Sequence, residues 1–336
     1  MPESIALLAI ESSCDETSAS VIINGQVKSN IVSTQLIHEK YGGVVPELAS
    51  RAHQQNILPV VDAALKVANI TKNDLKAVGF TRGPGLLGSL LVGASFSKGF
   101  ALANDIPLIE VNHMQAHILA HFIEEPKPPF PFICLTVSGG HTQLVIVKSH
   151  LDMEVVGETL DDAVGEAFDK GAKMLGLPYP GGPMIDKHAS LGNPLSFEFP
   201  VSEMKGLSFS FSGVKTSLLY FLQKRVKENA NFIDENINDI CASYQLALIK
   251  NLTRKLKKAT KVHKISQVAI AGGVAANSGL RNALVDLAEK EGWKVFVPKF
   301  EYCTDNAAMI AMATYYKYLE GEFTEQSISP LPRYSL

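Results

Sequence analysis

The strongest constraint in the sequence is an order of secondary-structure signals that occurs twice. Near the N-terminus, three strand-like runs precede alternating helical and strand patterns, and the same order restarts after residue 131. These runs are residues 6–10, 18–23 and 26–32 in the first half and 132–139, 142–148 and 153–158 in the second half. Three antiparallel strands followed by alternating helices and strands form a mixed sheet covered by helices. We therefore predict a duplicated α/β fold with two lobes and a cleft between them.

The segment EEPKPPFPF separates the two halves. Four of its residues between 126 and 131 are prolines, and neither a helix nor a strand continues through such a run. A chain of 336 residues also exceeds the size of roughly 250–300 residues at which a single core tends to split. The expected lobes are residues 1–131 and 132–336, with the last helix able to pack back on the first lobe.

The net charge, the cysteines and the apolar segments limit the classes of protein to which the chain can belong. The net charge of -3 argues against a protein that coats nucleic acid indiscriminately, although it leaves room for a local basic patch. The four cysteines show no paired spacing, which favours reduced thiols in a cytoplasmic protein. The apolar run near the N-terminus is too short for a signal peptide, and the longest apolar stretch, residues 83–103, carries Lys98 and five glycines. We expect no membrane segment.

Three polar loops follow predicted strands and point to a phosphate-bearing ligand. They are IESSCDETS (10–18), TVSGGHTQL (136–144) and AIAGGVAANSGL (269–280). Glycine lets backbone N–H groups approach an anion closely, and the N-terminus of a helix adds favourable dipole charge.

The stretch VNHMQAHILAHF places His113, His117 and His121 four residues apart, on one face of a helix. This pattern fits either a partly polar helix face or a metal site. Zinc peptidases with HExxH need a glutamate where Met114 stands, so the general base of that class is missing. Asp305, near the start of the last helix, is the candidate third ligand, although aspartate is also a common N-cap. Two imidazoles and one carboxylate suit Fe(II) or Zn(II) better than Mg(II).

Taken together, the motifs resemble those of the TsaD family, the tRNA threonylcarbamoyladenosine transferases, in the bacterial form. The resemblance runs from about residue 5 to residue 320 and rests on IESSCDETS, YGGVVPELASRAH, TRGPGLLGSLLVG, VNHMQAH, VSGGHTQL, GEAFDKGAKMLGLPYPGGP, FSFSGVKT, AGGVAANSGLR and CTDNAAM. It implies an actin-like fold, shared with Hsp70 and sugar kinases. It also implies transfer of a threonylcarbamoyl group from threonylcarbamoyl-AMP to N6 of adenosine 37, 3′ to the anticodon of tRNAs that read ANN codons, which forms t6A.

The resemblance also implies site residues and partners. One divalent metal per chain, usually iron and sometimes zinc, is bound by residues matching His113, His117 and Asp305, while His121 is outside the motif. The donor is bound by residues matching Thr136, Val137, Ser138, Gly139, Gly140, Asp169, Gly182, Asp186 and Asn277. A TsaB-like paralogue and a TsaE-like ATPase are the implied partners.

Several roles stay open at this level. Asp15 and Glu16 are candidates to take up the amine proton, or are turn carboxylates. The spacing of Asp169 in DDAVGEAFDKGAK also fits a solvated helix face. A cationic run, of which part is expected to meet tRNA phosphates, comprises Lys250, Arg254, Lys255, Lys257, Lys258, Lys261 and Lys264. The alternative functions are an ATP-dependent kinase or ATPase of the same fold and a non-catalytic dimerisation subunit.

Overall fold

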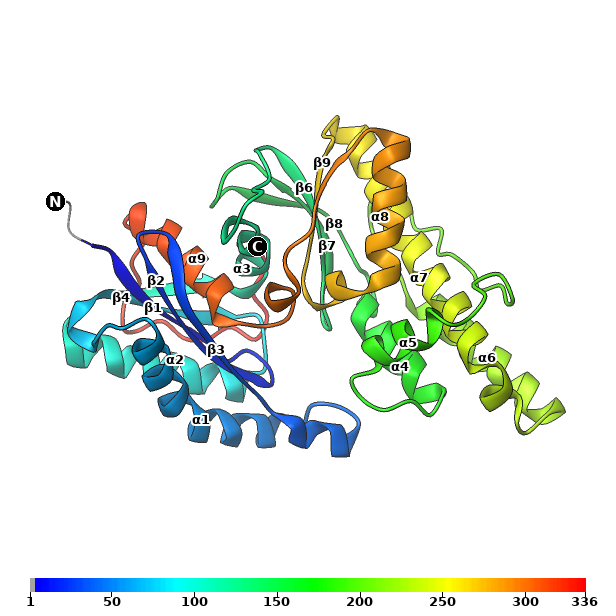
Figure 1. The fold of residues 1–336 in the computed structure, drawn as a ribbon, viewed down its shortest axis with the longest axis horizontal. Helices are drawn as coiled ribbons and strands as arrows, with labels where there is room; N and C mark the ends of the chain where they lie inside the picture. The colour runs from blue at the N-terminus through cyan, green and yellow to red at the C-terminus, as the bar shows by residue number, and fades with distance from the viewer. Residues whose placement is uncertain (1–3) are drawn as a thin grey trace. The chain divides into compact units, whose positions relative to one another are not determined.

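The chain forms two compact units in the computed structural model, which describes residues 4–336 (Figure 1). The first unit comprises the chain up to Lys127, together with Lys148–Met153 and Pro298–Leu336, and the second unit comprises Pro128–Val147 and Glu154–Val297. The chain thus first changes unit within the proline-rich segment. The units differ from the expected ranges 1–131 and 132–336 because the segment from Pro298 onwards returns to the first unit.

The first unit contains a five-stranded sheet with the strand order β3-β2-β1-β4-β5. Its strands are β1 (Ala6–Glu11), β2 (Glu16–Ile23), β3 (Gln26–Thr34), β4 (Leu75–Gly83) and β5 (Leu108–Asn112). Its helices are α1 (Pro46–Val67), α2 (Leu87–Asn104), α3 (His113–Leu119) and α9 (Ala307–Leu319). Asn24 and Gly25 join β2 to β3 with φ angles of 50° and 78°, and a type I′ turn, which the Asn-Gly pair predicts, requires positive φ at both residues.

The second unit contains the other sheet, with the order β10-β9-β6-β7-β8. Its strands are β6 (Phe132–Val137), β7 (Thr142–Val147), β8 (Met153–Glu158), β9 (Gln267–Ala271) and β10 (Lys294–Phe296). Its helices are α4 (Val164–Met174), α5 (Gly181–Ala189), α6 (Ser212–Glu228), α7 (Phe232–His263) and α8 (Ser278–Glu291). The sequence predicts two longer helices here, over about 212–228 and 237–262, so α7 begins five residues earlier than predicted and α5 is not predicted.

The two sheets have the same topology. In the first sheet, β1 pairs antiparallel with β2 and parallel with β4, and β4 pairs parallel with β5. In the second sheet, β6 pairs antiparallel with β7 and parallel with β9, and β9 pairs parallel with β10. The expectation of a duplicated α/β fold with mixed sheets flanked by helices is confirmed.

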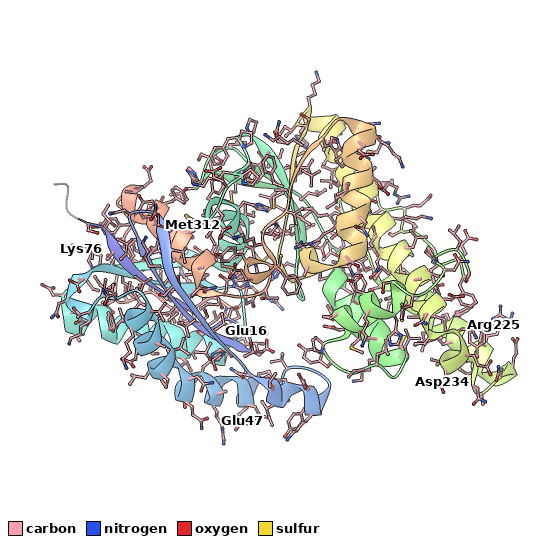
Figure 2. All side chains as sticks on the ribbon, in the orientation of Figure 1. Glu16, Glu47, Lys76, Arg225, Asp234 and Met312 are labelled. Atoms are coloured by element: carbon pink, nitrogen blue, oxygen red, sulfur yellow. The ribbon has the colours of Figure 1, made fainter. Side chains whose placement is uncertain are left out.

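Helices cover both faces of the first sheet, with α1 and α2 on one face and α9 on the other (Figures 1 and 2). Every residue of β1 is buried, which is typical of a strand that is covered on both faces. Helix α9 carries Met312 and is buried throughout Ala307–Thr314, as its nearly uninterrupted apolar sequence predicts. Small residues allow this close packing, since Gly79 of β4 lies directly against Thr314.

The segment after α9, residues 322–336, which we call the C-terminal strap, lies along the first unit. It is tied to the end of β5, where Asn112 Nδ2 donates hydrogen bonds to the carbonyl oxygens of Tyr334 and Ser335 at 3.3 and 3.1 Å. Within residues 4–336, no helix is both long enough and apolar enough to cross a membrane.

The contact between Gly79 and Thr314 gives a test of the packing of α9. A Cβ added at Gly79 would lie 1.9 Å from Thr314 Oγ1 and 2.8 Å from Thr314 Cβ. Gly79→Ala is therefore expected to lower the free energy of unfolding by about 1–3 kcal/mol, as overpacking does. Gly99→Ala in α2, where nothing lies within 4 Å of the added Cβ, is the control and should stabilise the protein by up to about 1 kcal/mol. Chemical denaturation measures both, and equal midpoints for Gly79→Ala and wild type would contradict the packing.

Candidate functional site

Two histidines are presented by helix α3, which begins directly after β5. Asn112 caps this helix, because its Oδ1 accepts hydrogen bonds from the backbone N–H groups of Met114 and Gln115 at 2.9 and 3.1 Å. His113 and His117 lie one turn apart, with ring centroids separated by 4.6 Å and ring planes at 84°. Both side chains are buried.

Asp305 lies at the same place, although it is almost 190 residues further along the chain. Its Oδ1 is 3.3 Å from His113 Nε2 and 3.2 Å from His117 Nε2, and the ligand atoms of the three residues all lie within 4.8 Å of one another. Asp305 is not the N-cap of α9, because Asn306 Oδ1 accepts from Met309 N and fills that role. We name His113, His117 and Asp305 the His–His–Asp cluster.

His121 takes no part in this cluster. The α-helix ends at Leu119, and Ala120–Phe122 form a turn of 3₁₀-helix, so the expected single helix through residue 122 is wrong. The tighter winding gives His121 a different position from the one that i, i+4 spacing predicts.

Glu11, which sequence reasoning did not assign to the site, contacts His113 through Nδ1, the ring nitrogen that does not face Asp305. It is the last residue of β1 and is fully buried. Its Oε2 lies 3.0 Å from His113 Nδ1 and 2.6 Å from Thr81 Oγ1, and its Oε1 accepts a hydrogen bond from Ser13 N. A carboxylate at the end of an otherwise apolar buried strand was the available signal, because a buried charge requires partners.

The charges in the cluster depend on one another. Burial alone would lower the pKa of His113, but the charges of Asp305 and Glu11 raise that pKa well above its usual value. Burial would likewise raise the pKa of Asp305, but the positive charge of His113 beside it lowers that pKa far below its usual value. The His117 pKa is lowered, by burial first, so this ring is neutral.

His117 has an unsatisfied buried side chain. Among the described residues neither its Nδ1 nor its Nε2 has a hydrogen-bond partner, since the approach of Nε2 to Asp305 is close but not aligned as a hydrogen bond. An unpaired buried polar atom is costly. A neutral imidazole with a free lone pair, beside a carboxylate and a second imidazole, is the donor set that a divalent transition metal binds.

Asp15 lies in the turn between β1 and β2, and Glu16, labelled in Figure 2, is the first residue of β2. The turn is fixed by His53, which lies 2.9 Å from the carbonyl oxygen of Cys14 through Nε2 and 2.7 Å from Thr17 Oγ1 through Nδ1. Because a carbonyl only accepts, Nε2 carries the proton, and Nδ1 accepts from the Thr17 hydroxyl.

The electrostatic setting of Glu16 is unusual for an acidic residue. Burial, followed by the negative charges of Asp305 and Asp15, raises the pKa of Glu16 well above its usual value. Burial also raises the pKa of the Cys14 thiol, so Cys14 is no thiolate nucleophile at neutral pH.

The second unit contains the residues expected to bind the donor. Thr136 and Val137 are buried in β6, so only their backbone can meet a ligand. Ser138 Oγ accepts from His141 N at 3.1 Å and shapes the turn that follows. Gly139 and Gly140 lie in this turn and are exposed, which leaves space beside their backbone.

Asp169 lies in α4 and holds the start of α5. Its Oδ1 accepts hydrogen bonds from Gly181 N at 2.8 Å and Gly182 N at 3.3 Å. Burial nevertheless raises the pKa of Asp169 above its usual value. The alternative of a solvated charged face is therefore wrong for Asp169, because its carboxylate is directed at the N-terminus of α5.

Asp186 and Asn277 are joined through Gln245 of α7, which sequence reasoning missed. Gln245 Nε2 donates to Asp186 Oδ1 at 3.1 Å, and Gln245 Oε1 accepts from Asn277 Nδ2 at 2.7 Å. Asp186 also accepts from Ser278 N and Oγ at 2.9 and 2.8 Å, while Asn277 caps α8 by accepting from Leu280 N. A buried glutamine on an apolar helix face was the signal for this network.

A family model described as "TsaD: tRNA N6-adenosine threonylcarbamoyltransferase" matches residues 26–312. Two proteins named tRNA N6-adenosine threonylcarbamoyltransferase, from Cytophaga hutchinsonii and Christiangramia forsetii, are 65% and 62% identical over 330 and 335 residues. These alignments cover 98% and 99% of this chain and 96% and 98% of the relatives.

Solved structures give the same fold at much lower identity. HypF from T. kodakarensis aligns with a TM-score of 0.62 at 16% identity, over 96% of this chain and 49% of its own. Component A of the (R)-2-hydroxyglutaryl-CoA dehydratase from Acidaminococcus fermentans aligns with a TM-score of 0.55 at 15% identity, over 94% of this chain and 99% of its own. The structural likeness shows the actin-like fold, and the match of sequence shows that the chain belongs to the TsaD family of tRNA N6-adenosine threonylcarbamoyltransferases.

Proposed function

We propose that this chain transfers the threonylcarbamoyl group of threonylcarbamoyl-AMP to N6 of adenosine 37 in tRNAs that read ANN codons. The family match gives the reaction class, and the observation that carries the assignment is the buried His–His–Asp cluster. An actin-like kinase that uses Mg-ATP binds its metal through carboxylates and water and does not need two buried imidazoles. The kinase and ATPase alternative is therefore not favoured.

The His–His–Asp cluster is the proposed site of one divalent metal, Fe(II) or Zn(II). The unsatisfied nitrogens of buried His117 and the convergence of Asp305 on both rings support this assignment. Three protein ligands leave coordination positions for substrate, and a bound metal supplies Lewis-acid stabilisation of negative charge on a carbonyl or phosphate oxygen.

The proposed donor site lies in the second unit. Gly139 and Gly140 offer open backbone N–H groups for the phosphate, as glycine turns after strands do. Asp169 and Asp186 each orient the first turn of a helix, α5 and α8 respectively, and their carboxylates suit ribose hydroxyls. Asn277 and Gly182 are the other proposed donor-binding residues. We place the Asn277 side chain beside the nucleotide, and Gly182 where the backbone approaches the nucleotide closely.

The chemistry explains why an activated donor is needed. The N6 amine of adenine is a weak nucleophile because its lone pair is delocalised into the ring. In the reaction a bond forms between N6 and the carbamoyl carbon, the bond from that carbon to the phosphate oxygen breaks, and AMP leaves with the electron pair. The proton lost from N6 requires an acceptor, and we assign this role to Asp15, with Glu16, whose pKa is raised, beside it.

The partners follow from the reaction and the family. tRNA is the substrate, and a TsaB-like paralogue and a TsaE-like ATPase are proposed to assemble with the chain. A cytoplasmic location stays a prediction. A non-catalytic dimerisation subunit would not need an intact His–His–Asp cluster, so the experiment below distinguishes such a subunit from an enzyme.

A reconstituted reaction tests the function and the metal together. Threonylcarbamoyl-AMP, unmodified tRNA and the partner proteins are expected to give t6A, measured by mass spectrometry of tRNA nucleosides. His117→Ala should lose its bound iron or zinc and lower t6A formation by at least about 100-fold, because even the loss of a residue that orients a ligand costs 10- to 100-fold.

His121→Ala is the matched control for this variant. His121 is a second buried histidine of the same segment and lies outside the cluster. It should keep its metal, measured by elemental analysis, together with most of its activity. Unchanged t6A formation in folded His117→Ala would remove the metal from the mechanism and revive the non-catalytic alternative.

Asp15→Ala tests the proton acceptor. Turnover is expected to fall by about 10²–10⁴-fold, the usual contribution of a general base, while metal content stays at the wild-type level. Both quantities are measured on the same preparation. Wild-type turnover in Asp15→Ala would exclude Asp15 from proton transfer.

The cations of α7 differ in whether they already have a partner within the second unit. Glu291 of α8 pairs with Lys257 and Lys261. Lys255 is only 3% exposed, and its ammonium donates to the carbonyl oxygens of Met204 and Gly206. These three lysines therefore already have partners within the second unit. Lys257 belongs to the run expected to meet tRNA, but Glu291 partly neutralises its charge.

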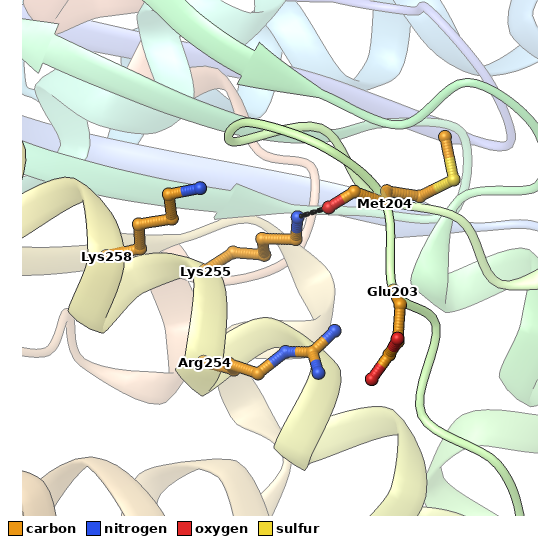
Figure 3. Close-up of a pocket in the computed structure, with 5 residues that line it drawn as sticks. All are labelled: Glu203, Met204, Arg254, Lys255 and Lys258. Atoms are coloured by element: carbon orange, nitrogen blue, oxygen red, sulfur yellow. Dashed lines mark hydrogen bonds between the residues drawn. The ribbon is translucent and has the colours of Figure 1, made fainter.

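Lys250, Arg254 and Lys258 are the exposed cations that remain on the same helix, and the last two lie one turn apart on one face. Arg254 and Lys258 line a pocket of about 220 Å³ together with Lys255, Glu203 and Met204 (Figure 3). Lys258 has no ion pair among residues 4–336. Arg254 donates one hydrogen bond to the carbonyl oxygen of Ser202. We assign Arg254 and Lys258 to contacts with tRNA backbone phosphates.

Charge reversal tests this surface. The double variant Arg254→Glu, Lys258→Glu is expected to weaken tRNA binding by about tenfold or more and to lower the slope of log affinity against log salt by about one per residue. The control is Lys224→Glu, Lys227→Glu on α6, which makes the same change in net charge at two exposed lysines. Fluorescence anisotropy over a salt series measures both, and equal affinities for the two double variants would refute the assignment.

A further inference from the structure

We infer that Glu11 is a positioning residue that fixes His113 with its Nε2 lone pair directed at the proposed metal. The inference rests on the proposed metal site and adds to it a residue outside the His–His–Asp cluster. Three observations carry it: the number of donors around Glu11, the rigid place of Glu11 in the sheet, and the contrast between the two imidazoles.

The surroundings of Glu11 define its role as an acceptor. Its two oxygens face Ser13 N–H, the Thr81 hydroxyl at 2.6 Å and His113 Nδ1 at 3.0 Å. An ionised carboxylate has only acceptor positions, so His113 must place its proton on Nδ1. When the ring gives up its second proton to hold a metal, the proton kept on Nδ1 leaves Nε2 as the metal-binding atom, and Nε2 is the atom that faces Asp305.

The position of Glu11 is set by the sheet. It ends β1, and Thr81 lies near the end of the neighbouring strand β4. Glu11 has no exposed surface, so its carboxylate cannot turn towards solvent. The hydrogen bond to His113 is therefore built into the first unit before any metal arrives.

The two imidazoles of the cluster are held differently. His113 Nδ1 has the carboxylate of Glu11 and, at 3.3 Å, the hydroxyl oxygen of Ser13. His117 Nδ1 has no partner among the described residues. A carboxylate on the far nitrogen orients a ligating imidazole and makes it a stronger donor, so His113 is the ligand on which metal affinity depends more.

Titration of the metal-free full-length chain with Zn²⁺, in competition with a chromophoric chelator, tests the inference without using activity. Glu11→Ala should weaken Zn²⁺ binding by about 10- to 100-fold. Glu11→Gln keeps one carbonyl acceptor but loses the charge and places an amide among donors, so its affinity should lie between those of Glu11→Ala and wild type. Wild-type affinity in both variants would overturn the inference.

Thr81→Val provides the control for loss of structure. It removes a buried hydrogen bond to Glu11 but leaves the contact between Glu11 and His113. Urea denaturation of each metal-free variant gives its stability. Thr81→Val should be destabilised and still bind Zn²⁺ with nearly wild-type affinity, whereas an affinity that falls in step with stability across all three variants would show a merely structural role. Failure of the wild-type protein to bind Zn²⁺ or Fe²⁺ would instead refute the metal site itself.

Discussion

The parallel pairing of β1 with β4 and of β4 with β5 is the constraint on which the candidate metal site depends. Parallel strands end at the same edge of a sheet, and polar groups that follow them gather there. Residue pairs Ile10–Phe80 and Thr81–Val111 fix this register. Glu11 and the start of α3 therefore reach the same edge.

The remaining member of the cluster comes from the other face of the sheet. Helix α9 packs on β1, β2 and β4, and Ala307 N and Ala308 N, in its first turn, donate to Ser18 Oγ and Asn30 Oδ1 at 2.8 and 3.1 Å. These contacts fix the start of α9, and hence Asp305, against the strands. A carboxylate so distant in sequence is thereby placed to within hydrogen-bonding distance of two imidazoles.

The second unit uses the same topology for different chemistry. Strand β6 is followed by a turn that contains Gly139 and Gly140, whereas the turn after β1 contains no glycine. Asp169 and Asp186 serve helix N-termini, and Gln245 joins Asp186 to Asn277. Two copies of one sheet topology thus carry, separately, the His–His–Asp cluster and the polar network of Asp186, Gln245 and Asn277.

Much of the fold could be predicted from the sequence because its signals are local. The repeated order of strands and helices, the Asn24–Gly25 turn and the spacing of His113 and His117 each depend on neighbouring residues only. Helix α5 escaped prediction because it begins with Gly181 and Gly182, which are poor helix formers, and its start is stabilised by Asp169 from another helix.

The residues that sequence reasoning missed depend on partners far along the chain. Glu11 is defined by Thr81 and His113, and its neighbours in sequence give no sign of either. The cations of α7 look equivalent until Glu291, on the next helix, pairs with two of them. The sequence of one helix therefore shows a cluster of cations, but it does not show which of them lack a partner and can bind another molecule.

The return of the chain to the first unit has a consequence for biosynthesis. Along the sequence, the residues of the second unit come after the strands of the first sheet and before helix α9, which covers one face of that sheet. During translation, a nascent chain therefore carries an apolar sheet face with no cover until the ribosome has made residues beyond Pro298. Asp305 lies in the same late segment, so the His–His–Asp cluster is complete only after that event.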